Sequence, residues 1–274
     1  MVIGTLCGLL GLIVGSFLNV VILRHGARAV DGRSICMSCG RQLAWYDMVP
    51  VFSWVFLRGR CRSCKSRISI QYPLVEAATG VLFAFIGVWA YPLVLYTWHM
   101  WPVFIAYFVI CALLVAIAVY DFKHTIISDG WAYTFASLAF FSHFLTIDSF
   151  PSIAILLVSG PLIALPLFLL WLVSRGTWMG LGDAKLALGI GWLLGPELGL
   201  LALLGAFILG ALVAVCILMP MPYIARALRI TQLGNAQSTF TMKSEVAFGP
   251  FLIMSCIVVW LMMLYGIPIP FLYL

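Results

Sequence analysis

Charged side chains are scarce in this chain: they make up 9% of its 274 residues, against 64% hydrophobic residues. A soluble domain carries roughly a quarter charged residues, so this composition excludes an ordinary soluble fold. The apolar length is enough for roughly eight crossings of a bilayer at about 20 residues each. We therefore expect an all-α polytopic membrane protein with about eight transmembrane helices.

The first 23 residues carry no charge at all. A secretory signal peptide begins with a basic region, which this stretch lacks, so we interpret it as a retained first transmembrane helix. The apolar runs and the Gly, Pro and Trp residues between them set the other spans. Helices are expected at about 3–23, 72–95, 102–121, 130–147, 152–174, 183–197, 198–219 and 248–270.

The net charge of +6 comes from 15 basic and nine acidic residues, and the basic ones are not spread evenly. Nine lie in 24–71, three in 220–247, and the others are Lys123, Arg175 and Lys185. If eight spans alternate, all 15 fall on one side, which the positive-inside rule makes cytoplasmic, with both termini outside. The charge is thus explained by membrane topology, and the expected partner is a lipid bilayer and no nucleic acid.

Four of the eight cysteines lie together in the one long polar segment that follows the first helix. They form two C-x-x-C pairs, Cys36 with Cys39 and Cys61 with Cys64. Two such pairs can close a tetrahedral site, and disulfides are disfavoured in the cytoplasm, so we predict Zn²⁺. Four thiolates leave no open ligand position, which indicates a structural metal. Two disulfides or a redox pair are the alternatives.

This arrangement predicts three parts. The first transmembrane helix, 1–23, leads into a small cytoplasmic, zinc-ribbon-like loop domain of four cysteines at 24–71. The remainder, 72–274, is expected to form a membrane core of about seven helices.

Two aspartates lie at the edges of apolar runs, where an ionisable group is costly and indicates function. Asp121 ends the third predicted span, and Asp183 begins the sixth after Gly180 and Gly182, which allow close backbone approach. The chain crosses out and back between them, so both reach the cytoplasmic end. We predict a proteolytic dyad in which the two acids share a proton. Alternatively, Asp183 caps a helix, and Asp121 pairs with Lys123 or is solvated at the membrane interface.

Other polar residues are weaker candidates. Asn19 lies inside the first span and needs an internal partner, while Gly15 permits close helix packing. Glu76 enters the second span and suits a partner in the basic loop better than catalysis. Asp129 looks like a helix cap, and Lys185, in the run that holds the second aspartate, is a further supporting residue.

Taken in order, these motifs resemble those of the type IV prepilin peptidases, which are bifunctional leader peptidases and N-methyltransferases of the bacterial inner membrane. The resemblance covers nearly the whole chain. It depends on Gly15-Ser-Phe-Leu-Asn19, the two C-x-x-C pairs, Val49-Pro-Val-Phe-Ser53-Trp, Arg58-Gly-Arg-Cys61, Tyr72-Pro-Leu-Val-Glu76, Asp121 and Gly180-Leu-Gly-Asp183. One departure is Ile127-Ser-Asp129, where the family tends to have Ile-Pro-Asp.

The resemblance implies that Asp121 and Asp183 are the catalytic pair. It implies prepilin and pseudopilin substrates, cut between a basic leader and a hydrophobic helix, and methylation of the new N-terminus from S-adenosylmethionine. The cysteine loop would support that second activity. The residues themselves show no glycine-rich strand-turn-helix pattern for S-adenosylmethionine, so the methyltransferase expectation depends on the resemblance.

Two functions of other classes also fit the aspartates or the cysteines. A transporter could use the acids to carry protons or cations, because glycines beside a membrane carboxylate are typical of transport sites. The cysteine pairs and the lack of a second, inverted half argue against it. A zinc-stabilised scaffold of a pilus or secretion assembly is the other alternative.

Overall fold

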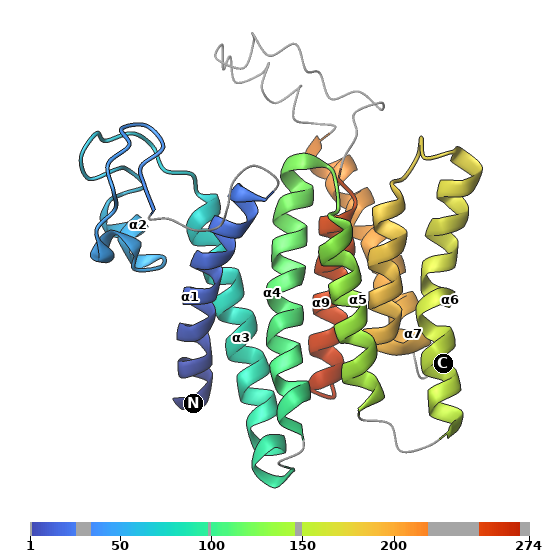
Figure 1. The fold of residues 1–274 in the computed structure, drawn as a ribbon. Helices are drawn as coiled ribbons and strands as arrows, with labels where there is room; N and C mark the ends of the chain where they lie inside the picture. Colours follow the sequence, from blue (N-terminus) through green and yellow to red (C-terminus); the bar gives the residue numbers. More distant parts are fainter. Residues whose placement is uncertain (1, 26–33, 98–99, 146–149, 219–246, 269–274) are drawn as a thin grey trace. The chain divides into compact units, whose positions relative to one another are not determined.

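The computed structural model describes residues 2–25, 34–97, 100–145, 150–218 and 247–268 (Figure 1). The predicted second polar segment, 220–247, lies almost entirely outside them. The chain forms two compact units, Met1–Val119 and Tyr120–Leu274. The three-part division at 24 and 72, made from the sequence, concerns topology and stays a prediction.

The described residues fold mainly into helices, and the only pairing of extended chain among them is two isolated bridges. Most helices begin and end within a few residues of the predicted spans, because apolar runs bounded by polar residues set both. The helices are α1 (Val2–Arg24), α2 (Phe52–Phe56), α3 (Gln71–Tyr96), α4 (Trp101–His124), α5 (Asp129–Phe144), α6 (Phe150–Ser174), α7 (Leu181–Val213) and α9 (Gly249–Leu264).

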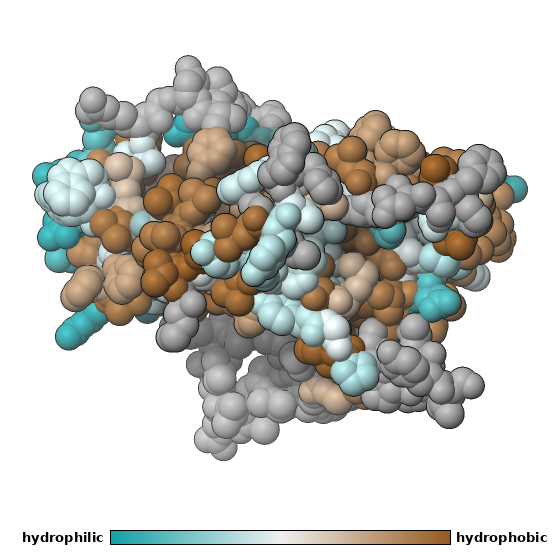
Figure 2. Space-filling model, turned by 90° about the horizontal axis from the view of Figure 1, so that it is seen from below, coloured by the Kyte–Doolittle hydropathy of each residue, from teal (hydrophilic) through white to brown (hydrophobic). Residues whose placement is uncertain are grey.

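Among the described residues, five apolar helices are long enough to cross a membrane by length and composition: α1, α3, α4, α6 and α7. The helices α5 and α9 are shorter, with 16 residues each. Many side chains on the outside of the long helices are Leu, Ile, Val or Phe, and apolar residues make up much of the face shown in Figure 2. The protein is therefore a multi-pass membrane protein.

The helix α7 is not one straight rod. Gly195 has φ 79° and ψ −178°, and Pro196 follows it. A Cβ atom on Gly199 would lie 3.5 Å from the Cα of Gly191, although eight residues of straight helix span about 12 Å. The chain therefore doubles back at Gly195, which confirms the predicted break between 183–197 and 198–219.

In the first unit, α1 and α3 pack side by side through small residues. A Cβ atom on Gly15 would lie 2.7 Å from the Cα of Glu76, and one on Gly11 would lie 2.8 Å from the Cα of Gly80. The predicted close packing at Gly15 is thus confirmed. The ring pair Phe83–Phe108, with centroids 4.6 Å apart, joins α3 to α4.

In the second unit, α7 packs against α5, α6 and α9. Here too glycines allow the contact: a Cβ on Gly191 would lie 2.8 Å from the Cα of Gly160 in α6, and one on Gly205 would collide with Ser255 in α9. Without water between helices, close van der Waals packing holds them together. The helix α7, which carries Asp183 in its first turn, is thereby packed among three neighbouring helices.

Candidate active site

Asp121 lies in the last turn of α4 and is only 4% exposed. The helix ends because Thr125 adopts a left-handed conformation, with φ 53°, and its N–H donates to the Asp121 carbonyl oxygen at 2.7 Å. The side-chain atom Oδ2 has no hydrogen-bond partner among the described residues. A buried carboxylate oxygen without a partner is uncommon in folded proteins, and a catalytic role is one explanation for it.

Asp183 lies in the first turn of α7 and is 8% exposed. The N-cap of this helix is Gly180, with φ −74° and ψ 149°, and the backbone N–H of Asp183 donates to the Gly180 carbonyl oxygen at 3.3 Å. Gly180, and not Asp183, is therefore the N-cap residue, although the Asp183 carboxyl group interacts with the backbone of Gly180. The position of Asp183 three residues after the cap places it inside the first turn, where the helix dipole stabilises negative charge.

Both aspartates belong to the unit Tyr120–Leu274, and their carboxyl groups are close enough to interact electrostatically. No ion pair joins Asp121 to Lys123 in the part of the chain that the structure describes, which removes that alternative. Neither acid forms an ion pair with a basic side chain among the described residues, and burying two such acids is costly. The arrangement is suited to a coupled pair that shares a proton.

Two residues that the sequence analysis did not select complete this site. Ile127 is 9% exposed, and a Cβ atom on Gly182 would lie 2.9 Å from its Cβ. Gly249, the first residue of α9, is packed so closely that an added Cβ would collide with Oδ2 of Asp121 and lie 3.2 Å from Cδ1 of Ile127. The end of α4 and the starts of α7 and α9 therefore meet at the aspartates. The sequence did contain a signal for the start of α9, because Gly249 directly precedes Pro250 and proline is common in the first turn of a helix.

Lys185 and Asp129 form an ion pair near this site, with Nζ and Oδ1 2.7 Å apart. The Lys185 ammonium also lies 5.3 Å from the centre of the Tyr133 ring. Asp129 begins α5 and Ser128 is its N-cap, so the predicted capping role of Asp129 is wrong by one residue. Because 65% of its side chain is exposed, Asp129 differs from the two buried acids and is not a member of the pair.

The four cysteines of the polar segment come together in the first unit. Their sulfur atoms all lie within 4.8 Å of one another, and those of Cys36 and Cys64 are 3.8 Å apart. All are free thiols, so the structure contains neither of the alternative disulfides. Four sulfurs at about 2.3 Å from one Zn²⁺ in a tetrahedron lie about 3.8 Å from one another, so the donor set fits zinc.

Each pair of cysteines is carried by a tight turn. Gly40 donates to the carbonyl oxygen of Cys36 at 2.9 Å, and Lys65 to that of Cys61 at 3.0 Å, with both donors in left-handed conformations. Backbone N–H groups of Cys39 and Ser38 lower the pKa of the Cys36 thiol to about 6. A thiolate at neutral pH is the form that binds a metal.

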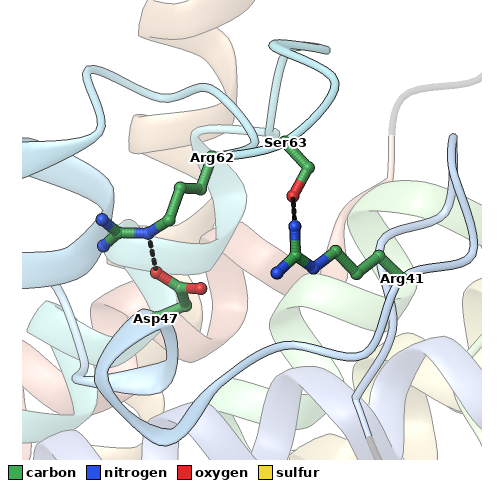
Figure 3. Close-up of polar contacts among 4 residues, drawn as sticks. All are labelled: Arg41, Asp47, Arg62 and Ser63. Carbon is green, nitrogen blue, oxygen red and sulfur yellow. Dashed lines mark hydrogen bonds and ion pairs between the residues drawn. The ribbon is translucent and has the colours of Figure 1, made fainter.

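Side-chain contacts tie the two turns to each other and to the loop between them (Figure 3). Arg41 donates to the Ser63 hydroxyl at 2.8 Å, and Arg62 pairs with Asp47 at 2.8 Å while lying over the Tyr46 ring. Exposed pairs of this kind contribute little stability. A segment with so small a core is of the kind that metal binding commonly stabilises.

Asn19 and Glu76 belong to the first unit, whereas both aspartates belong to the second. Asn19 is buried and donates to the carbonyl oxygens of Gly15 and Tyr72 at 3.3 and 3.2 Å, which provides the internal partners it was expected to need. Glu76 accepts a hydrogen bond from the backbone N–H of Val51 at 2.7 Å. Among the described loop residues, its hydrogen-bond partner is thus a backbone group.

Comparison with known proteins matches both halves of the chain. Residues 108–215 match the type IV leader peptidase family, and residues 9–91 match the bacterial peptidase A24 N-terminal domain. A prepilin leader peptidase/N-methyltransferase of Vibrio cholerae serotype O1 is 33% identical over 229 residues, which cover 74% of this chain and 83% of that protein. The chain belongs to the type IV leader peptidase family.

Two further relatives carry the same description as the Vibrio protein. The one from Pectobacterium carotovorum is 34% identical over 73% of this chain and 80% of its own length. The one from Myxococcus xanthus is 57% identical, but the match covers only 27% of this chain and 23% of that protein. No solved structure matches the chain. The predicted resemblance is confirmed.

In this leader peptidase, the matched ranges separate the two sites. The range 108–215 contains both aspartates, and the range 9–91 contains all four cysteines. Gly249, which contacts Asp121, lies outside both ranges.

Proposed function

We propose that this protein is a membrane aspartyl endopeptidase that removes basic leader peptides from prepilins and pseudopilins, and that it methylates the new N-terminus. The proposal is supported by family membership and by the names of the relatives. The observation that carries it is the buried pair Asp121 and Asp183, with one carboxylate oxygen of Asp121 unpaired among the described residues. The transporter and scaffold alternatives are not favoured, because the relatives are named as peptidases.

The chemistry of such a pair is general acid–base catalysis. One carboxylate takes a proton from a water molecule while the other, in its neutral form, donates a proton to the carbonyl oxygen of the peptide bond. Water then attacks the carbonyl carbon without a covalent enzyme intermediate. Burial of both groups strengthens these electrostatic interactions.

The position of the pair suits the proposed substrate. Asp121 is in the last turn of α4 and Asp183 in the first turn of α7, so both belong to helix ends. If the basic residues mark the cytoplasmic side, these ends face the cytoplasm of a bacterial inner membrane, with both termini outside. A prepilin brings its basic leader to the same boundary, so the cut requires no charge to cross the bilayer.

The cysteine site is proposed to hold a structural Zn²⁺ through Cys36, Cys39, Cys61 and Cys64. The ion would fix the fold of the loop domain and take no part in hydrolysis, since all four ligand positions are filled by thiolates. S-adenosylmethionine would supply the methyl group for the second activity. That assignment is supported by the relatives' names and by no residue of this chain.

The test is cleavage of a purified prepilin by the purified enzyme and by the variants Asp121→Asn and Asp183→Asn. Each variant is expected to lose cleavage, because an amide can neither accept nor carry the shared proton. Asp129→Asn is the matched control: it removes the same charge from an exposed acid nearby. Cleavage that survives in either dyad variant would rule out the proposed mechanism. Incubating the cleaved product with labelled S-adenosylmethionine tests the methyl transfer separately.

A further inference from the structure

The loop domain that holds the cysteines exposes several large apolar side chains. On and just before α2, the exposed fractions are 55% for Phe52, 59% for Val55, 84% for Phe56 and 77% for Trp45. We call these four residues the aromatic edge. Trp54 is turned the other way: its ring packs on Gly59 and its Nε1 donates to the Ile68 carbonyl oxygen at 3.3 Å. So many exposed aromatics in a small polar segment indicate a binding surface.

One hydrogen bond sets the position of the aromatic edge along α3. Val51, the residue before α2, donates its N–H to the carboxylate of Glu76 at 2.7 Å. Glu76 lies five residues after the start of α3 at Gln71, which corresponds to about 7.5 Å along the helix axis. Figure 1 likewise shows α2 level with the first turns of α3. Interfacial segments bury their apolar face about 5–10 Å into the headgroup region, so α2 lies at such a depth if α3 enters the bilayer at its start.

The residue that attaches α2 to α3, Val51, has an unfavourable backbone conformation. Val51 has φ 62° and ψ −52°, and a β-branched residue rarely adopts a positive φ. Glu76 itself is 7% exposed and sits where α1 and α3 are in close contact at Gly15. The buried carboxylate therefore fixes the height of α2 on a helix that crosses the membrane.

The charge of the loop domain agrees with a membrane surface. Residues 34–71 contain six basic residues and one acidic residue, Asp47. Arg58 and Arg60 directly follow α2 and are exposed. Basic side chains next to inserted aromatics are typical of segments that lie on anionic lipid headgroups.

We propose that the aromatic edge lies in the headgroup and upper acyl region of the bilayer that α1 and α3 cross. The loop domain is then a membrane-attached module, and its cysteine site is held close to the lipid surface. The bilayer is the favoured occupant because the depth set by Glu76, the aromatic side chains and the basic charge all fit lipid. A hydrophobic helix of a substrate is the competing occupant.

The experiment places a nitroxide-bearing amino acid at position 56 of the full-length protein in nanodiscs of phosphatidylethanolamine and phosphatidylglycerol. Position 37 is the matched control, since Met37 is also 84% exposed but lies in the first cysteine turn. At each position we measure the ratio of the collision rate with oxygen to the collision rate with a water-soluble nickel chelate. We expect this ratio to be several-fold higher at position 56 than at position 37. Position 55 gives a second label with the same expectation if position 56 does not tolerate the change.

Equal accessibility at positions 56 and 37 would overturn the proposal. So would protection of position 56 that occurs only after a prepilin is added, since the occupant would then be the substrate. Zinc content equal to that of the unlabelled protein verifies that the loop domain is folded in each labelled variant. The measurement needs no cleavage, so its outcome is independent of the roles proposed for the aspartates.

Discussion

The two glycines of the Gly180-Leu-Gly-Asp183 motif should respond differently to the same substitution. In Gly182→Ala, the added Cβ would lie 2.9 Å from the Cβ of Ile127 and 3.5 Å from its Cγ1 and Cδ1. The Cβ of Ile127 is fixed to the backbone, so rotation of the side chain cannot relieve the closest contact. The start of α7 or the turn that carries Ile127 has to move.

The loss of activity expected in Gly182→Ala depends on Asp183, which directly follows the substituted residue. Overpacking of this kind costs about 1–3 kcal/mol of stability. The displaced residue is directly followed by Asp183, and moving a catalytic group by about 1 Å costs on the order of 100-fold in rate. We expect Gly182→Ala to lower kcat for prepilin cleavage by about 10- to 100-fold while most of the protein stays folded.

Gly180→Ala is the matched control. An added Cβ there would meet no atom closer than 3.8 Å, and φ −74° with ψ 149° is allowed for alanine. Its kcat should stay close to that of the unchanged enzyme. The assay is cleavage of a purified prepilin over time, with the thermal unfolding midpoint of each variant measured in the same detergent. Equal losses in both variants, or none in Gly182→Ala, would refute this reasoning.

Three further predictions concern other parts of the molecule. Gly249→Ala should reduce cleavage at least as strongly as Gly182→Ala, because its Cβ would collide with Asp121 itself; full activity of a folded variant in the same assay would contradict this. Cys36→Ser should lose about one zinc ion per chain in metal analysis, as one tetrahedral site requires, and unchanged zinc would reject the four-cysteine site. Asp129→Asn breaks the exposed pair with Lys185 and should lower stability by less than about 1 kcal/mol, measured by thermal unfolding.

The sequence by itself determined the helices and the cysteine site. Apolar runs have to be helical in lipid, since every backbone group needs an internal partner there, and this sets most of the helix boundaries. The reversal at Gly195-Pro196 was visible because those residue types break a helix locally. The spacing of the cysteines likewise indicated four ligands for one ion. The aspartates stood out because charge is rare in such a chain.

Only the tertiary structure decided which residues surround the two aspartates. Gly249 is 128 residues from Asp121 in the chain, and nothing local marks a glycine that another helix touches. The contact of Ile127 with Gly182 and the hydrogen bond from Val51 to Glu76 are of the same kind. They depend on how helices pack through small residues in lipid, and that packing is set jointly by distant segments and not by the pattern of any one of them.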